Sequence, residues 1–144
     1  MKKPPTPPAA GLRLLLVDDN SIGLSARRVI FLGEGYQVTA CTRPDQAIRE
    51  FESSTFDVVV TDYRMPDMNG VELIAALRAI RPVPVVMLSS VAEVVGLTEA
   101  NTGADAVVPK NSHEIGNMVR AVNRLALKKP VSSQAAKRAR KKAG

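Results

Sequence analysis

Three near-continuous apolar runs of strand length constrain this chain more than any other feature of its sequence. A strand that faces water on one side alternates polar and apolar residues, whereas a strand covered by helices on both faces is apolar throughout. Segments with the apolar spacing of helices separate the runs, which is typical of a parallel sheet. The runs are residues 12–17, 56–61 and 85–88. We therefore predict an α/β fold with these runs as its central strands.

Two further segments are predicted to be edge strands. In residues 36–41 (YQVTAC) apolar and polar side chains alternate, as expected when one face is partly exposed. Residues 106–108 form a short apolar run that Pro109 closes, and proline in a sheet is confined to edges, ends and bulges. Right-handed crossovers then give the strand order 2-1-3-4-5. The predicted fold is a doubly wound five-stranded parallel sheet, the flavodoxin-like (βα)5 arrangement.

Five helices are predicted to connect and follow these strands. The first is expected over residues 21–32, with an apolar stripe formed by Ile22, Ala26, Val29 and Ile30. The others are expected after a capping box in residues 42–45, after the capping residues Asp67 and Asn69, more weakly over residues 92–100, and after Asn111 and Ser112. Each strand is thus followed by one helix.

Polar residues gather where the predicted strands end. In such sheets a ligand binds beyond the carboxyl ends of the strands, at the point where the strand order reverses. Carboxylates without a nearby histidine or cysteine favour Mg²⁺, and an ammonium with a hydroxyl opposite them suits a phosphoryl group. The residues are Asp18, Asp19, Asp62, Ser89, Ser90 and Lys110. This pattern indicates a phosphoryl-transfer centre in which a carboxylate can be the nucleophile.

Each of these residues also has a simpler interpretation when taken alone. Asp18, Asp19 and Asp62 could each be a helix N-cap, because aspartate is favoured there. Ser89 could be a turn residue, and Lys110 a solvated surface lysine. Their joint occurrence at four strand ends, in this order, makes coincidence a poor explanation.

Four segments resemble the receiver domains of two-component response regulators: LLLVDDN (14–20), DVVVTDYRMPDMNG (57–70), VPVVMLSS (83–90) and GADAVVPK (103–110). The resemblance covers residues 12–127. It implies that Asp62 accepts the phosphoryl group and that Asp18, Asp19, Asp62 and the backbone carbonyl of Arg64 bind Mg²⁺. It also implies that Ser89 is the switch hydroxyl and Lys110 the phosphate partner. The expected donor is a sensor histidine kinase or a phosphotransfer protein, and the expected chemistry is autocatalytic acceptance and self-dephosphorylation only.

Several positions depart from the pattern of that family. Val107 stands where the family usually has an aromatic switch residue. Asn111 follows the lysine in place of a frequent proline, while Pro109 precedes it, and Ser90 replaces a frequent small alanine. These departures bear on switching and on access to Asp62 more than on the chemistry. His113 is expected to be a surface or capping residue.

The two ends differ from the body of the chain in composition. We predict a disordered Pro-rich head over residues 1–11, a receiver domain over 12–127 and a basic, disordered tail over 128–144. Residues 12–127 hold 11 basic and 14 acidic residues, so the net charge of +6 arises from the ends. Neither an export signal nor a membrane span is found, and the single cysteine, Cys41, is expected to be a buried strand residue. A cytoplasmic location is therefore expected.

Two classes of function remain open on this sequence. The first is a stand-alone receiver, monomeric or weakly dimeric, that signals through the surface of its fourth helix, fifth strand and last helix. The second is a phosphate-independent binding protein whose basic tail contacts nucleic acid or another anionic partner. An aspartyl phosphatase is disfavoured because no D-x-D-x-T segment follows a strand.

Overall fold

The computed structural model describes residues 9–90 and 96–129. Its core is a five-stranded parallel sheet with the order β2-β1-β3-β4-β5, which confirms the predicted fold class and both predicted edge strands. The strands are β1 (Arg13–Val17), β2 (Gln37–Cys41), β3 (Val58–Asp62), β4 (Val85–Ser90) and β5 (Ala106–Lys110). All four pairings bring the carboxyl ends of the strands to one edge of the sheet.

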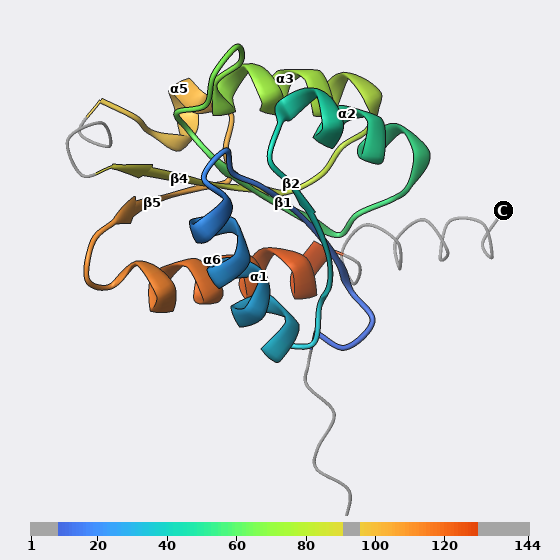
Figure 1. The fold of residues 1–144 in the computed structure, drawn as a ribbon, viewed down its shortest axis with the longest axis vertical. Helices are drawn as coiled ribbons and strands as arrows, with labels where there is room; N and C mark the ends of the chain where they lie inside the picture. Colours follow the sequence, from blue (N-terminus) through green and yellow to red (C-terminus); the bar gives the residue numbers. More distant parts are fainter. Residues whose placement is uncertain (1–8, 91–95, 130–144) are drawn as a thin grey trace, which may run out of the picture.

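Helices cover both faces of this sheet. They are α1 (Ser21–Gly33), α2 (Pro44–Ser53), α3 (Gly70–Ile80), α5 (Glu99–Thr102) and α6 (Glu114–Lys129). Figure 1 shows α1 and α6 on one face and α2, α3 and α5 on the other. Two apolar clusters result: β1 contributes Leu14 and Leu16 to the cluster under α1 and α6, and Leu15 and Val17 to the other. This double coverage explains why the central strands are apolar throughout.

Of the four residues in the apolar stripe predicted for α1, Ile30 packs partly buried against the core, whereas the other three prove wrong. Ile22 is 81% exposed, and Ala26 and Val29 are also exposed, whereas Leu24 and Phe31 are buried against the sheet. The buried face therefore follows positions 24, 27 and 31, a spacing of three and four residues that places all three on one side of a helix. Arginine occupies position 27, so the core-facing side of α1 carries a charge.

Two helix starts also differ from the prediction. The N-cap of α2 is Arg43, which makes no side-chain capping bond, so the capping box expected from Thr42 is absent. Pro44 opens this helix with its preset backbone angle. By contrast, Asn69 and Glu72 form a reciprocal capping box at the start of α3, in the predicted capping region.

The helix predicted over residues 92–100 is only partly testable, because residues 92–95 lie outside the described ranges. Leu97 and Thr98 are not helical, and the short helix α5 begins at Glu99. Thr98 and Asn101 cap its start reciprocally. Gly103 ends it in the left-handed region, with a φ angle of 80°. Local capping chemistry therefore determines where this helix begins.

The described part of the chain extends slightly beyond residues 12 and 127. Ala9 is buried in the core and α6 continues to Lys129, while the rest of the predicted head and tail lies outside the described residues. Strand β5 continues through Pro109 to Lys110, which is compatible with its place at a sheet edge. Cys41 is 1% exposed, as expected of a buried strand residue. None of the described helices combines the length and apolar character needed to cross a membrane.

Candidate functional site

Strand β3 and the loop after it fix the position of Asp62. Every residue of β3 is buried, and Asp62 at its end is 6% exposed. The loop folds back so that the amide of Gly70 donates to the carbonyl of Tyr63 at 2.7 Å. A Cβ atom at position 70 would lie 2.7 Å from the Asp62 carbonyl oxygen, so only glycine fits there without displacement. Gly70 thus allows α3 to begin directly against the end of β3.

Asp62 lies beside the two carboxylates that follow β1. One carboxylate oxygen from each of Asp18, Asp19 and Asp62 lies within 4.8 Å of the others. Asp18 is buried and Asp19 is exposed. The N-cap of α1 is Asn20, whose side chain accepts from the Gly23 amide at 3.0 Å, and α3 is capped by Asn69. The three aspartates therefore do not cap these two helices, and the simpler interpretation of each does not hold.

Lys110 and Ser89 complete the cluster from β5 and β4. The Lys110 ammonium nitrogen lies 2.6 Å from Asp62 Oδ1. Ser89 is 1% exposed, and its hydroxyl has no hydrogen-bond partner among residues 9–90 and 96–129. A buried hydroxyl without a partner is destabilising by about 1–3 kcal/mol. A ligand oxygen that accepts from Ser89 would remove this penalty.

The remaining predicted residues lie around the same cleft, which has a volume of about 550 Å³. Its lining includes Asp18, Asp19, Asp62, Arg64, Ser89, Ser90 and Lys110.

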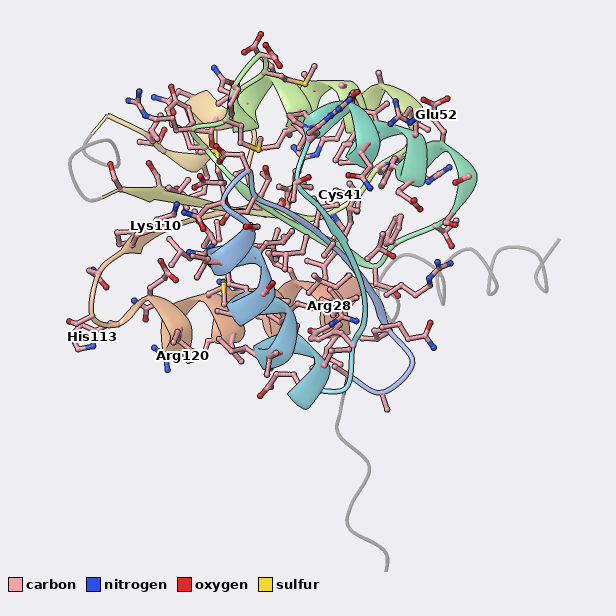
Figure 2. The ribbon with its side chains drawn as sticks, in the orientation of Figure 1. Arg28, Cys41, Glu52, Lys110, His113 and Arg120 are labelled. Atoms are coloured by element: carbon pink, nitrogen blue, oxygen red, sulfur yellow. The ribbon has the colours of Figure 1, made fainter. Side chains whose placement is uncertain are left out.

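Two further residues singled out in the sequence do not line this cleft. Val107 lies in β5 opposite Met87 and packs, half-buried, against the apolar cluster under α2 and α3. His113 is exposed, and Figure 2 shows it away from Lys110, in agreement with a surface position.

The electrostatic environment of Asp62 disfavours its ionised form in the metal-free protein. Burial raises the pKa of the Asp62 carboxyl above its ordinary value, and the nearby charge of Asp18 acts in the same direction. Lys110 opposes this effect through its hydrogen bond and its charge, with a smaller contribution from Arg27. A cation bound among the three carboxylates would favour the ionised form.

Arg27 is a member of the site that the sequence prediction missed. Its Nη1 atom lies 2.5 Å from Asp18 Oδ2, and its Nη2 atom lies 3.2 Å from Glu114 Oε2 at the start of α6. The sequence feature that could have identified Arg27 is its spacing, because position 27 lies on the same helix face as Leu24 and Phe31. An arginine between two large apolar residues on one face requires a buried partner.

The donor set fits a hard divalent cation. It consists of carboxylate oxygens, one of them on the exposed Asp19, with no histidine or cysteine in the described cluster. Arg27 and Lys110 supply the positive charge that offsets these acids in the protein alone.

Comparison with known proteins identifies the family. The family model for the response regulator receiver domain matches residues 14–123. The chain belongs to this family. The receiver domain is 33% identical over 117 residues to the sensory transduction protein RegX3 of Mycolicibacterium smegmatis, a match that covers 77% of the chain and 50% of RegX3. It is 30% identical over 131 residues to a gliding motility regulatory protein of Myxococcus xanthus, covering 87% of the chain and 17% of that protein.

The first of these relatives are longer than the matched part, since the chain spans 17% to 50% of their lengths. Among solved structures, the receiver domain resembles the adenylate cyclase of Rhodopirellula baltica with a TM-score of 0.78 at 27% identity, covering 90% of this chain and 97% of that one. It also resembles the receiver domain of the Pseudomonas aeruginosa sensor histidine kinase PA1611, with a TM-score of 0.69 at 25% identity and coverage of 81% and 98%. That structure has a magnesium ion coordinated in its active site cleft.

Proposed function

We propose that this receiver domain accepts a phosphoryl group on Asp62 and signals through the surface change that follows. The observation that carries the proposal is the position of the Asp62 carboxylate. It lies 2.6 Å from the Lys110 ammonium and within reach of two further carboxylates, with the unpartnered Ser89 hydroxyl lining the same cleft. This arrangement supports nucleophilic attack at a phosphorus atom whose negative oxygens are neutralised on several sides.

The transfer can be written from the residues present. An Asp62 oxygen forms the new bond to phosphorus, while the bond between phosphorus and a histidine nitrogen of the donor breaks and that imidazole retains the electron pair. Lys110 binds one phosphoryl oxygen and Ser89 donates to another, which satisfies its buried hydroxyl. Asp18, Asp19, Asp62 and the Arg64 carbonyl would hold Mg²⁺, which when bound would offset charge on the phosphoryl oxygens.

The partners follow from the same chemistry. The donor is a sensor histidine kinase or a phosphotransfer protein, and hydrolysis of the aspartyl phosphate resets the domain. The output surface is formed by residues 92–100, β5 and α6, since Ser89 and Lys110 connect the site to β4 and β5. Residues 92–95 of that surface, and most of the basic tail on which the nucleic-acid alternative depends, lie outside the described residues.

Acetyl phosphate with Mg²⁺ tests this proposal without the cognate kinase. Intact-mass spectrometry is expected to show the gain of one HPO₃ group in the wild type and none in Asp62→Asn. Asp67→Asn is a matched control, because Asp67 is an exposed aspartate of the same loop and asparagine tolerates its left-handed backbone. An unmodified wild type, or a phosphoryl group that survives Asp62→Asn, would contradict the proposal.

A further inference from the structure

Arg27 joins three elements of the fold at the acidic cluster. Its side chain is 11% exposed and reaches Asp18 after β1 with one nitrogen and both oxygens of Glu114 on α6 with the other. Figure 1 shows α1 beside α6 on the face of the sheet where these contacts lie. A single guanidinium is thus shared between a carboxylate of the candidate metal site and the first turn of another helix.

Gly23 provides the space that this contact needs. A Cβ atom at position 23 would lie 3.0 Å from Arg27 Nη1 and 3.2 Å from Asp18 Oδ2. Glycine weakens a helix relative to alanine, yet it occupies the first turn of α1 beneath the arginine. A larger residue at position 23 would therefore crowd the ion pair from the same helix, four residues before Arg27.

Both oxygens of Asp18 accept hydrogen bonds from this chain. Oδ1 accepts from the Asn20 amide at 2.9 Å, and Oδ2 accepts from Arg27 at 2.5 Å. A divalent cation that coordinates Asp18 through Oδ2 shares or displaces the contact with Arg27, and a cation bound through either oxygen repels the guanidinium through space. Glu114 already accepts from the same guanidinium at 3.2 Å and can keep it, at a helix start where its negative charge is also favoured.

We propose that Arg27 is a positioning residue that bridges Asp18 and Glu114 while the site lacks a divalent cation, and that it gives up Asp18 and keeps Glu114 when the cation binds. Arg27 thereby weakens cation binding, Glu114 strengthens it, and occupancy of the site is transmitted to the start of α6. This inference rests on the proposed Mg²⁺ site. Because coupling between sites is reciprocal, any partner that engages Glu114 alters the affinity for the cation in turn.

Calorimetric titration with MgCl₂ at fixed ionic strength tests the proposal on the full chain. Arg27→Gln is expected to tighten Mg²⁺ binding on the order of tenfold, because one positive charge beside a doubly charged ion is removed. Glu114→Gln is expected to weaken binding severalfold, because Arg27 then has only Asp18 as its carboxylate partner. Opposite changes in Mg²⁺ affinity in the two variants distinguish this electrostatic role from a structural one, since a general loss of folding would weaken Mg²⁺ binding in both.

Two matched variants control for the change in charge alone. Arg28→Gln removes the neighbouring, exposed arginine of α1, and Glu52→Gln removes an exposed glutamate of α2; both residues are labelled in Figure 2. Each is expected to bind Mg²⁺ within about twofold of the wild type, since exposed distant charges are screened by salt. Arg27→Lys retains the charge and is expected to return the affinity toward that of the wild type.

Resonances of backbone amides supply the second measurement. Mg²⁺ is expected to shift the amides of Glu114 and Ile115 in the wild type, and much less in Arg27→Gln. Equal Mg²⁺ affinities of Arg27→Gln and Arg28→Gln in folded proteins would overturn the role of Arg27 while leaving the metal site intact. Weaker binding in both Arg27→Gln and Glu114→Gln would also overturn it, and absence of binding in both wild type and Arg27→Gln would overturn the metal site as well.

Discussion

Asp62 is held in a position that is unfavourable for a lone charged carboxylate. Its β3 neighbours are buried, it lies close to two other aspartates, and Lys110 only partly offsets these effects. The ionised form of Asp62 therefore lowers the stability of the folded state. Two predictions at the residue scale follow from this effect and from the glycine beside Asp62.

Asp62→Asn is expected to raise the melting temperature of the metal-free protein by a few degrees at neutral pH. The pKa of Asp62 in the folded state is raised above its ordinary value of 3.8. The folded state therefore binds the proton more tightly than the unfolded state, and ionisation of Asp62 lowers the free energy of unfolding.

The effect of this substitution is expected to depend on pH. The destabilisation by Asp62 is fully present above its folded-state pKa and absent below 3.8. The difference in melting temperature between Asp62→Asn and wild type should thus be largest at neutral pH and should disappear as the pH falls below about 4. Thermal melts in a chelator followed by circular dichroism measure it. A difference that grows on acidification would contradict this account.

Gly70→Ala is expected to destabilise the protein by about 1–3 kcal/mol and to slow phosphorylation of Asp62. The new methyl group would lie 2.7 Å from the Asp62 carbonyl oxygen and 3.0 Å from Met87 Sδ. Urea unfolding and the rate of modification by acetyl phosphate measure the two effects. Gly33→Ala is the control, because a Cβ atom there meets no atom within 4 Å, and it is expected to be neutral or stabilising by up to about 1 kcal/mol.

At the same scale, the sequence predicted that Asp62 and Lys110 belong to the site but did not predict Arg27. Asp62 and Lys110 stand at the ends of strands whose apolar runs are easily recognised. Arg27 lies inside a helix whose exposed residues include several large apolar side chains, so the apolar stripe pointed to the wrong face. Which face of an amphipathic helix is buried depends on the neighbouring elements, and these are not encoded in its own spacing.

At the scale of elements, strands were easier to predict than helix ends. Four strands reach the carboxylates, the hydroxyl and the ammonium because each apolar run ends where the sheet ends. Helix starts depend on single side-chain bonds, and Thr42 and Asn69 looked equally suitable as caps in the sequence. Only Asn69 is placed so that its side chain accepts from the third amide of the helix.

Asn69→Ala is accordingly expected to destabilise the protein by about 1 kcal/mol, because the amide of Glu72 loses its acceptor. Thr42→Ala is expected to stay within about 0.5 kcal/mol of the wild type, since α2 is not capped by that side chain. Chemical denaturation of both variants provides the comparison. A loss in Thr42→Ala equal to that in Asn69→Ala would contradict the assignment of the caps.

At the scale of the whole molecule, the strand order was predictable because handedness leaves few ways to connect such strands. The register that brings Ser90 level with Lys110 and Asp62 level with Leu88 was not predictable, since it depends on packing across the sheet. Consequently the sequence indicated which residues meet at the cleft, and the structure supplied the distances between them.

The single cysteine reports on the integrity of this sheet. Cys41 ends the edge strand β2, is 1% exposed, and burial raises the pKa of its thiol to about 11. Alkylation by iodoacetamide is expected to be at least about 100-fold slower in the native protein than in urea, because only opened molecules react. If Cys41 reacts only after global unfolding, Mg²⁺ with beryllofluoride should slow the alkylation further, because a ligand that binds the folded state stabilises it. Equal rates in native and unfolded protein would contradict the buried position.

The contact between Asp62 and Lys110 also has a consequence for the growing chain. Ribosomes add about 5–20 residues per second, so Asp62 emerges seconds before Lys110. In that interval the Asp62 carboxylate exists without its ammonium partner and without the edge strand that carries this partner. A polypeptide released prematurely after β4 would contain Asp62 and lack the ammonium that the proposed phosphoryl transfer uses. On the proposed function, Asp62 therefore becomes a competent acceptor only once translation has passed β5.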